Sequence, residues 1–139
     1  MKHYYSIERN VQLIVALMKA HGIKRVIASP GSTNVCLSHS LQNDPFFEMY
    51  SSVDERSAAY LACGLATETG EPVALTCTEA TASRNYMSGL TEAYYRHLPI
   101  LCITATNDIT CLGQNHPQMI DRSSLPNDIV CKSVFIPAI

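Results

Sequence analysis

Several features that mark common classes of binding protein are scarce in this sequence. Only 10 of its 139 residues are Lys or Arg, and the formal net charge is -2. No basic segment carries interleaved aromatic residues, which argues against a nucleic-acid partner, because phosphate binding needs clustered positive charge. The apolar run of the first expected helix, Leu13–Met18, is far too short to cross a bilayer. This run follows the polar residues 8–10 and precedes no small-residue cleavage site, so it is no signal peptide. We expect a cytoplasmic protein that binds neither nucleic acid nor membranes.

Close cysteine pairs are also missing. A disulfide framework would need an oxidising compartment, which nothing in the sequence indicates. A zinc site would need ligand pairs at short spacing, and the nearest approach is Cys111 with His116. We therefore expect free thiols, mostly as small buried apolar groups, and no metal site. The six cysteines are Cys36, Cys63, Cys77, Cys102, Cys111 and Cys131.

Three familiar catalytic or phosphate-binding motifs are absent. The sequence has no GxGxxG dinucleotide fingerprint, no GxxxxGK[ST] phosphate loop and no GxSxG nucleophile elbow. Five histidines occur, but none stands in a motif with a nucleophile. Any chemistry on this chain must therefore use other groups.

What the sequence does contain is an alternation of helical and strand-like segments over one domain, residues 1–139. With 47% hydrophobic residues the chain can bury a substantial core. Short apolar runs separated by helical patterns indicate βαβ units, which form a parallel sheet with helices on both faces. The predicted fold class is therefore α/β, doubly wound and mostly parallel. We expect helices at 6–21, 34–41, 57–69 and 82–98, strands at 26–28, 46–53, 71–78 and 99–106, a loop at 107–124, and a last strand-like piece at 132–138.

Small polar residues follow each of the four predicted strands. The segments are SPGSTN, SSVDER, TEATAS and TATND. In a parallel sheet the carboxyl ends of the strands lie at one edge, where ligands of such folds bind. Ordinary turn chemistry gives similar composition, because Ser, Thr, Asn and Gly populate turns of every kind. The pattern alone leaves both interpretations open.

Glu55 poses the sharpest question. It stands where a strand-like run meets a helical pattern, and Ser52 three residues earlier completes the S-x-x-E signature of a capping box. On these residues alone, a helix cap is the preferred interpretation over a chemical role.

Five segments, in order, carry a resemblance to a known family: SPGS, DERSAAYLACGLA, VALTCT, NYMSGLTEA and LPILCITA. Over about Glu8 to Ile136 the chain resembles the pyrimidine-binding (Pyr) domain of thiamine-diphosphate enzymes. It is most similar to the 2-succinyl-5-enolpyruvyl-6-hydroxy-3-cyclohexene-1-carboxylate synthases of the menaquinone pathway, and more distantly to acetolactate synthases. The resemblance implies a flavodoxin-like Pyr fold and the cofactor thiamine diphosphate.

The resemblance also implies roles for single residues. Glu55 matches the glutamate that hydrogen-bonds N1′ of the aminopyrimidine and promotes the imino tautomer, whose neighbouring nitrogen removes the C2 proton. That role suits a desolvated carboxyl with a raised pKa, and it makes the cap secondary. Further cofactor-binding positions are Pro30, Gly31, Thr78, Thr81 and Asn85, and the substrate-side positions are Ser32 and Gln118.

Two positions depart from the family pattern. The synthases usually have an arginine directly after the serine that matches Ser32, and here Thr33 and Asn34 follow. Loss of this arginine argues against a dicarboxylate substrate, which favours a planar bidentate cation. The usual Ser-Gly-Thr turn is here Glu79-Ala80-Thr81, which adds an unexpected carboxylate.

The family also has a second α/β domain that holds magnesium and the diphosphate, and nothing in these 139 residues resembles it. The chain is thus interpreted as half of an active site that acts on a 2-oxo acid, with a diphosphate-binding domain or subunit as partner. Helices rich in small and apolar residues predict a homodimer or higher oligomer. A non-catalytic binding or assembly module with the same fold is the alternative, and an unrelated flavodoxin-like domain with another ligand is a third hypothesis.

Overall fold

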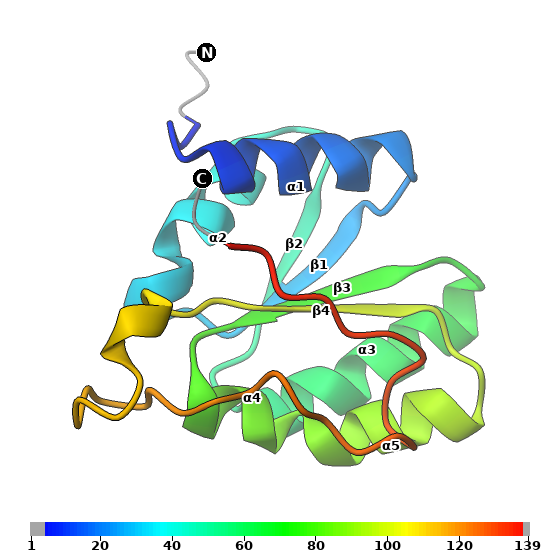
Figure 1. Cartoon of the computed structure of the whole chain (residues 1–139). Coiled ribbons are helices and arrows are strands. Elements are labelled where there is room, and N and C mark those ends of the chain that lie inside the picture. The colour runs from blue at the N-terminus through cyan, green and yellow to red at the C-terminus, as the bar shows by residue number, and fades with distance from the viewer. Residues whose placement is uncertain (1–4, 138–139) are drawn as a thin grey trace.

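The computed structural model of the chain describes residues 5–137 and shows helices packed on a central sheet (Figure 1). The four strands are β1 (Arg25–Ala28), β2 (Glu48–Ser51), β3 (Val73–Cys77) and β4 (Ile100–Thr104). The helices are α1 (Arg9–Ala20), α2 (Val35–Gln42), α3 (Glu55–Thr69), α4 (Ala80–Asn85) and α5 (Met87–Tyr95), with short 3-10 turns η1 (Ser32–Asn34) and η2 (Ile109–Cys111). The α/β prediction is confirmed.

All strand pairs are parallel, and their order across the sheet is β2-β1-β3-β4. From β1 the chain moves outward to β2, then crosses back to form β3 on the other side of β1. Such a reversal is a topological switch point, and ligands of open α/β sheets bind in the crevice beside it. In this fold the switch point lies between the carboxyl ends of β1 and β3.

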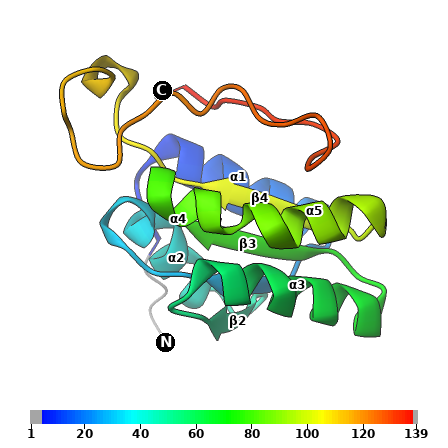
Figure 2. The ribbon, with the colours of Figure 1, turned by 90° about the horizontal axis from the view of Figure 1, so that it is seen from below.

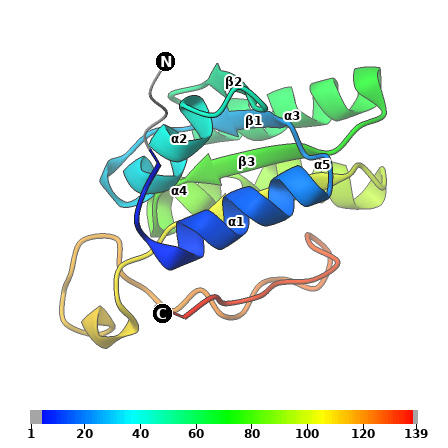
Figure 3. The same cartoon turned by 90° about the horizontal axis from the view of Figure 1, so that it is seen from above.

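Helices cover both faces of the sheet, as the 90° views show (Figures 2 and 3). On one face α1 and α2 pack over a cluster that includes Val15, Met18 and Leu41. On the other face α3, α4 and α5 pack over Ile27, Leu75 and further buried side chains. Every position of β3 is buried, so its sequence need not alternate between apolar and polar residues.

Three predicted elements differ from the structure. The first helix begins at Arg9, three residues later than its pattern suggested. The single helix expected at 82–98 is two, α4 and α5. At the junction the Tyr86 amide donates to the Ser83 carbonyl only three residues back, which tightens the turn. The prediction of a final strand at 132–138 is wrong over residues 132–137, which pair with no strand of the sheet. Position 138 lies outside the described residues.

The chain after β4 runs back beside the molecule without regular structure after η2 (Figure 1, yellow to red). It is attached at separate points: Ile129 is buried against the α3–α5 core, and Asn10 Nδ2 donates to the Pro137 carbonyl at 2.7 Å. Among residues 5–137, no helix combines the length and the apolar character that crossing a membrane requires.

Candidate functional site

The loops after β1 and β3 meet at the switch point. A Cβ placed on Gly31 would penetrate the van der Waals shell of Thr78 Cγ2. The backbone at Gly31 is extended, with φ of -167°, so the requirement for glycine here is space rather than conformation. Two predicted cofactor-binding residues, Gly31 and Thr78, are therefore brought into contact.

Asn34 holds the β1 loop in this position. Its side chain is buried, accepts from the Gly31 N–H at 2.9 Å, and donates to the Ser29 carbonyl at 3.2 Å. It also lies 3.4 Å from Thr76 Oγ1 on β3. In the sequence Asn34 is only a departure from the family pattern, whereas in the structure its three contacts hold the loop after β1 against β3. Pro30 and Ser32, on either side of Gly31, are exposed.

Glu55 is the first residue of α3, at the carboxyl edge of the sheet. The capping-box interpretation is wrong, because Asp54 is the N-cap and its carboxylate accepts from the Ser57 amide at 2.8 Å. Ser52 instead donates from Oγ to the Asp54 carbonyl at 3.0 Å. Within residues 5–137 no hydrogen bond or ion pair engages the half-buried Glu55 carboxylate. The helix start is satisfied without Glu55, which leaves its carboxylate available.

Three buried polar side chains, Ser29, Cys77 and Tyr86, lie near the carboxyl ends of β1 and β3. Burial raises the pKa of the Cys77 thiol to about 12, and the Glu55 carboxylate acts in the same direction. The pKa of the fully buried Tyr86 hydroxyl is also raised, chiefly by burial. Neither the Tyr86 hydroxyl nor Ser29 Oγ has a well-formed hydrogen bond within the described part of the chain. This arrangement keeps Cys77 a neutral thiol at the end of β3.

Gln118 and Thr81 meet, as a site made from both would require. Thr81 Oγ1 donates to Gln118 Oε1 at 2.7 Å, and the Ala80 amide reaches the Gln118 carbonyl at 3.3 Å. Gln118 has a φ of 59°, in the left-handed region. Asn85 is exposed one turn further along α4 and donates to the Thr81 carbonyl at 3.2 Å. The segment after β4 is thus hydrogen-bonded to the first turn of α4.

The predicted site residues do not include two charged residues of this region, Glu79 and Arg122. Glu79 is only 2% exposed, and its Oε1 accepts from the Asn107 N–H at 2.9 Å. Arg122 donates to Ser83 Oγ at 3.2 Å and to the Ala105 carbonyl at 2.9 Å. Glu79 was noticed as an extra carboxylate, but its partners are distant in sequence. Arg122 gave no signal, because a single Arg in a polar loop looks like any solvated residue.

The potential metal-ligating side chains are dispersed in the part of the chain that the structure describes. Residues 5–137 contain no group of three or more His, Cys, Asp or Glu side chains placed to hold an ion. The six cysteines are free, and only Cys63 and Cys77 are fully buried. Cys36 and Cys131 are exposed, so the expectation of mostly buried thiols was too simple.

Comparisons with known proteins show the family of the chain. Residues 9–125 match the family model described as "Thiamine pyrophosphate enzyme, N-terminal TPP binding domain". A 2-succinyl-5-enolpyruvyl-6-hydroxy-3-cyclohexene-1-carboxylate synthase of Bacteroides thetaiotaomicron is 40% identical over 135 residues, which are 97% of this chain and 24% of the relative. The synthase of Christiangramia forsetii is 45% identical over 112 residues, 81% of this chain and 19% of the relative.

A solved structure supports the fold. The thiamine diphosphate-dependent 4-hydroxybenzoylformate decarboxylase of Rhodococcus jostii RHA1 superposes with a TM-score of 0.73 at 22% identity, over 81% of this chain and 21% of that one. The chain spans about a quarter of the length of the first relatives it matches. Most of each relative therefore has no counterpart in these 139 residues. With a family model covering residues 9–125, the chain belongs to the thiamine pyrophosphate enzymes and carries their N-terminal TPP-binding domain.

Proposed function

We propose that this Pyr domain supplies Glu55 to the aminopyrimidine of thiamine diphosphate, in an enzyme that acts on a 2-oxo acid by decarboxylation or carbon–carbon bond formation. The observation that carries the proposal is a half-buried carboxylate at the start of α3 with no hydrogen-bonding partner among residues 5–137. A carboxylate in that state can accept a hydrogen bond from a ligand without first breaking one within the protein.

The loops after β1 and β3 come together at the switch point, where the pyrimidine would bind. Gly31 has no side chain at its contact with Thr78, so the two loops approach each other closely. Asn34 fixes the Gly31 loop. We assign Pro30, Gly31, Thr78, Thr81 and Asn85 to the pyrimidine side, and Ser32 and Gln118 to the substrate side.

Bound thiamine diphosphate supplies the carbanion chemistry that amino-acid side chains lack. The part of this chain is to hold and move a proton at the Glu55 carboxylate. Docking of a partner domain over the start of α3 would remove water from Glu55.

We place the diphosphate and Mg²⁺ on a partner domain, since Mg²⁺ needs oxygen ligands that no side-chain cluster of residues 5–137 offers. We further propose a homodimeric assembly in the cytoplasm. The synthases of the relatives suggest carbon–carbon bond formation, although the arginine of the usual motif is replaced by Thr33.

A non-catalytic assembly module remains the second candidate, and the buried Glu79 carboxylate is the observation that favours it. However, Glu79 accepts a hydrogen bond from a backbone amide of the loop after β4. This contact gives Glu79 a structural purpose that is compatible with activity.

The test is Glu55→Gln in the enzyme reconstituted with a diphosphate-binding domain. The glutamine keeps the shape of the side chain but cannot take up a proton, so exchange of the cofactor C2 proton, followed by NMR, should slow by roughly 100-fold or more. Glu68→Gln, on the exposed face of the same helix, is the matched control and should exchange at the wild-type rate. Unchanged exchange in Glu55→Gln would refute the proposed role of Glu55.

A further inference from the structure

Glu79 is a buried carboxylate between β3 and α4. Its Oε1 accepts a hydrogen bond from the Asn107 N–H at 2.9 Å, while its Oε2 has no hydrogen-bond partner within residues 5–137. An ionised carboxylate is costly to bury unless hydrogen bonds and opposite charge compensate. The contact with Asn107 joins the start of α4 to the chain just after β4, across 28 residues of sequence.

Arg122 supplies opposite charge and a second connection between the same two regions. Its Nη1 donates to Ser83 on α4, and its Nη2 donates to the Ala105 carbonyl at the end of β4. Burial lowers the pKa of Arg122, and the negative charge of Glu79 acts in the opposite direction. The two side chains therefore attract each other while each holds a different backbone group of the loop.

The segment 105–122 is thus held at both of its ends. Asn107 and Ala105 hold its beginning, and Arg122 holds its end. Between these two points, the Gln118 carbonyl accepts a hydrogen bond from the Ala80 amide, and Gln118 Oε1 accepts one from the Thr81 hydroxyl. Figure 1 shows the segment (yellow to orange) projecting beyond the sheet next to α4.

We propose that Glu79 and Arg122 form a positioning pair that fixes the loop 105–122 on α4 and thereby sets Gln118 beside Thr81 before any partner domain is bound. Only the use of Gln118 toward substrate rests on the proposed function; the positioning itself does not.

Amide hydrogen exchange on the full 139-residue chain, resolved to single amides by NMR, tests the pair without cofactor or activity. In Glu79→Ala the Asn107 and Ala80 amides should exchange roughly tenfold faster or more, as expected for losing a hydrogen bond to a charged group. The amides of β1 and β3 should keep their rates. In Glu79→Gln the side-chain carbonyl can still accept from Asn107, but the attraction to Arg122 is lost, so both amides should exchange at rates between those of the wild type and of Glu79→Ala.

Variants of Arg122 test the same proposal independently if Glu79→Ala does not fold. Arg122→Ala should speed the exchange of the same two amides, and Arg122→Lys should behave like Arg122→Ala, because one ammonium cannot reach both acceptors in the fork geometry of a guanidinium. Glu68→Ala is the matched control. Wild-type exchange in Glu79→Ala or in Arg122→Ala, or an equal effect of Glu79→Gln and Glu79→Ala, would overturn the proposal.

Discussion

Gly31 and Gly64 have the same side chain and opposite surroundings. A Cβ on Gly31 would collide with Thr78 Cγ2, whereas a Cβ on Gly64, on the exposed side of α3, would meet no atom within 4 Å. We predict that Gly31→Ala lowers the free energy of unfolding by about 1–3 kcal/mol, the usual cost of overpacking. Gly64→Ala should raise it by about 0.5–1 kcal/mol, because alanine is the better helix former. Urea denaturation measures both.

The collision at Gly31 involves one methyl group. Thr78→Ser removes it, so the double variant Gly31→Ala/Thr78→Ser should recover most of the stability lost in Gly31→Ala. A full loss in the double variant would mean that Gly31 is needed for its backbone and not for the close approach of the two loops.

The position of a residue was predictable where two sequence patterns meet. Glu55 stands where a strand-like run meets a helical pattern, and the structure places it at the start of α3. Its chemical role came from the family resemblance and stays a prediction. The capping-box expectation failed because Asp54, one residue closer to the helix, offers the better-placed carboxylate. Asn34 and Arg122 could not be found, since their partners on β3, β4 and α4 are fixed only by tertiary packing.

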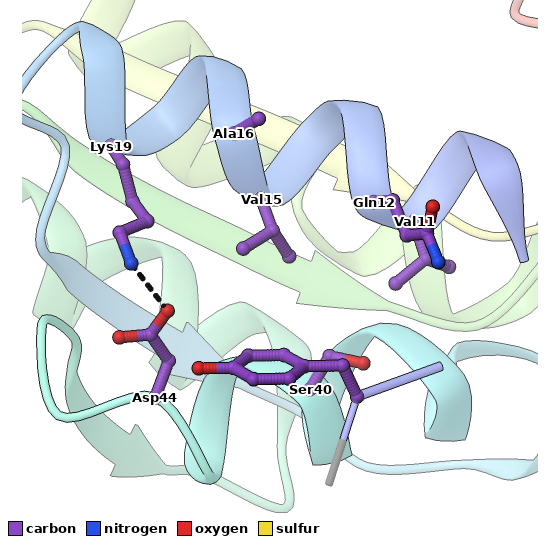
Figure 4. A pocket seen from close by; sticks show the side chains of 8 residues that line it. Val11, Gln12, Val15, Ala16, Lys19, Ser40 and Asp44 are labelled. Carbon is purple, nitrogen blue, oxygen red and sulfur yellow. Dashed lines mark hydrogen bonds and ion pairs between the residues drawn. The ribbon is translucent and has the colours of Figure 1, made fainter. Parts of the chain in front are cut away.

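Among the elements, α1 and the end of α2 are joined by the Lys19–Asp44 ion pair, 2.7 Å long (Figure 4). The Asp44 carboxylate also accepts from the Phe46 amide at 3.0 Å. Burial alone would raise the pKa of Asp44, but Lys19, the Phe46 amide and Tyr5 outweigh it, so the pKa is lowered. A lowered carboxyl pKa stabilises the fold at every pH above the unfolded-state value, near 4, and this stabilisation is lost as the pH falls through the folded-state value.

We therefore predict that Asp44→Asn lowers the free energy of unfolding by about 1–3 kcal/mol at pH 7, the range for breaking a buried hydrogen-bonded partner. As the pH falls below 4 the difference between the two proteins should shrink, because the unfolded chain takes up a proton at Asp44 before the folded protein does, and it should vanish only below the folded-state pKa. Denaturant titrations at pH 7, 5 and 3 measure this convergence. A constant difference across that range would show that Asp44 acts through packing instead of charge.

Element types followed from periodicity, and element ends did not. Helix α3 was predicted to end near Thr69 and does, because Gly70 takes the left-handed conformation with φ of 67° that closes it. The division between α4 and α5 lies within one helical pattern, at Tyr86, whose amide donates to the Ser83 carbonyl. The expected strand at 132–138 has strand-like composition, but a ladder needs a neighbouring strand, and β4 pairs only with β3 among the described residues.

At the scale of the whole molecule, α3 and α5 leave apolar side chains uncovered. Tyr60 and Leu61 on α3 are 46% and 44% exposed, and Tyr95 on α5 is 62% exposed. Large apolar patches on soluble domains usually mark interfaces. We predict a homodimer or higher oligomer by light scattering at micromolar concentration, and a dissociation constant at least roughly tenfold weaker in Tyr60→Lys. Ile7→Lys, at a 91% exposed position outside these helices, is the control. A monomer mass for the wild type would contradict the prediction.

Cofactor affinity also depends on the whole assembly. Most of the charge of thiamine diphosphate is in its diphosphate, and its capture needs Mg²⁺ with oxygen ligands, for which residues 5–137 offer no acidic cluster. What the chain offers is the Glu55 carboxylate and contacts with the loops that carry Gly31 and Thr78. We predict millimolar affinity for the 139-residue chain alone, or about 4 kcal/mol of binding free energy, and no turnover of 2-oxo acids.

Calorimetry with Mg²⁺ present tests that affinity, and addition of a diphosphate-binding domain from a related synthase should restore tight binding and turnover. Thiamine without its diphosphate is the matched ligand control. It should bind the isolated chain about as weakly as the full cofactor does, because both would contact only the pyrimidine side. Micromolar binding of thiamine diphosphate, but not of thiamine, would show that this chain holds a phosphate site of its own.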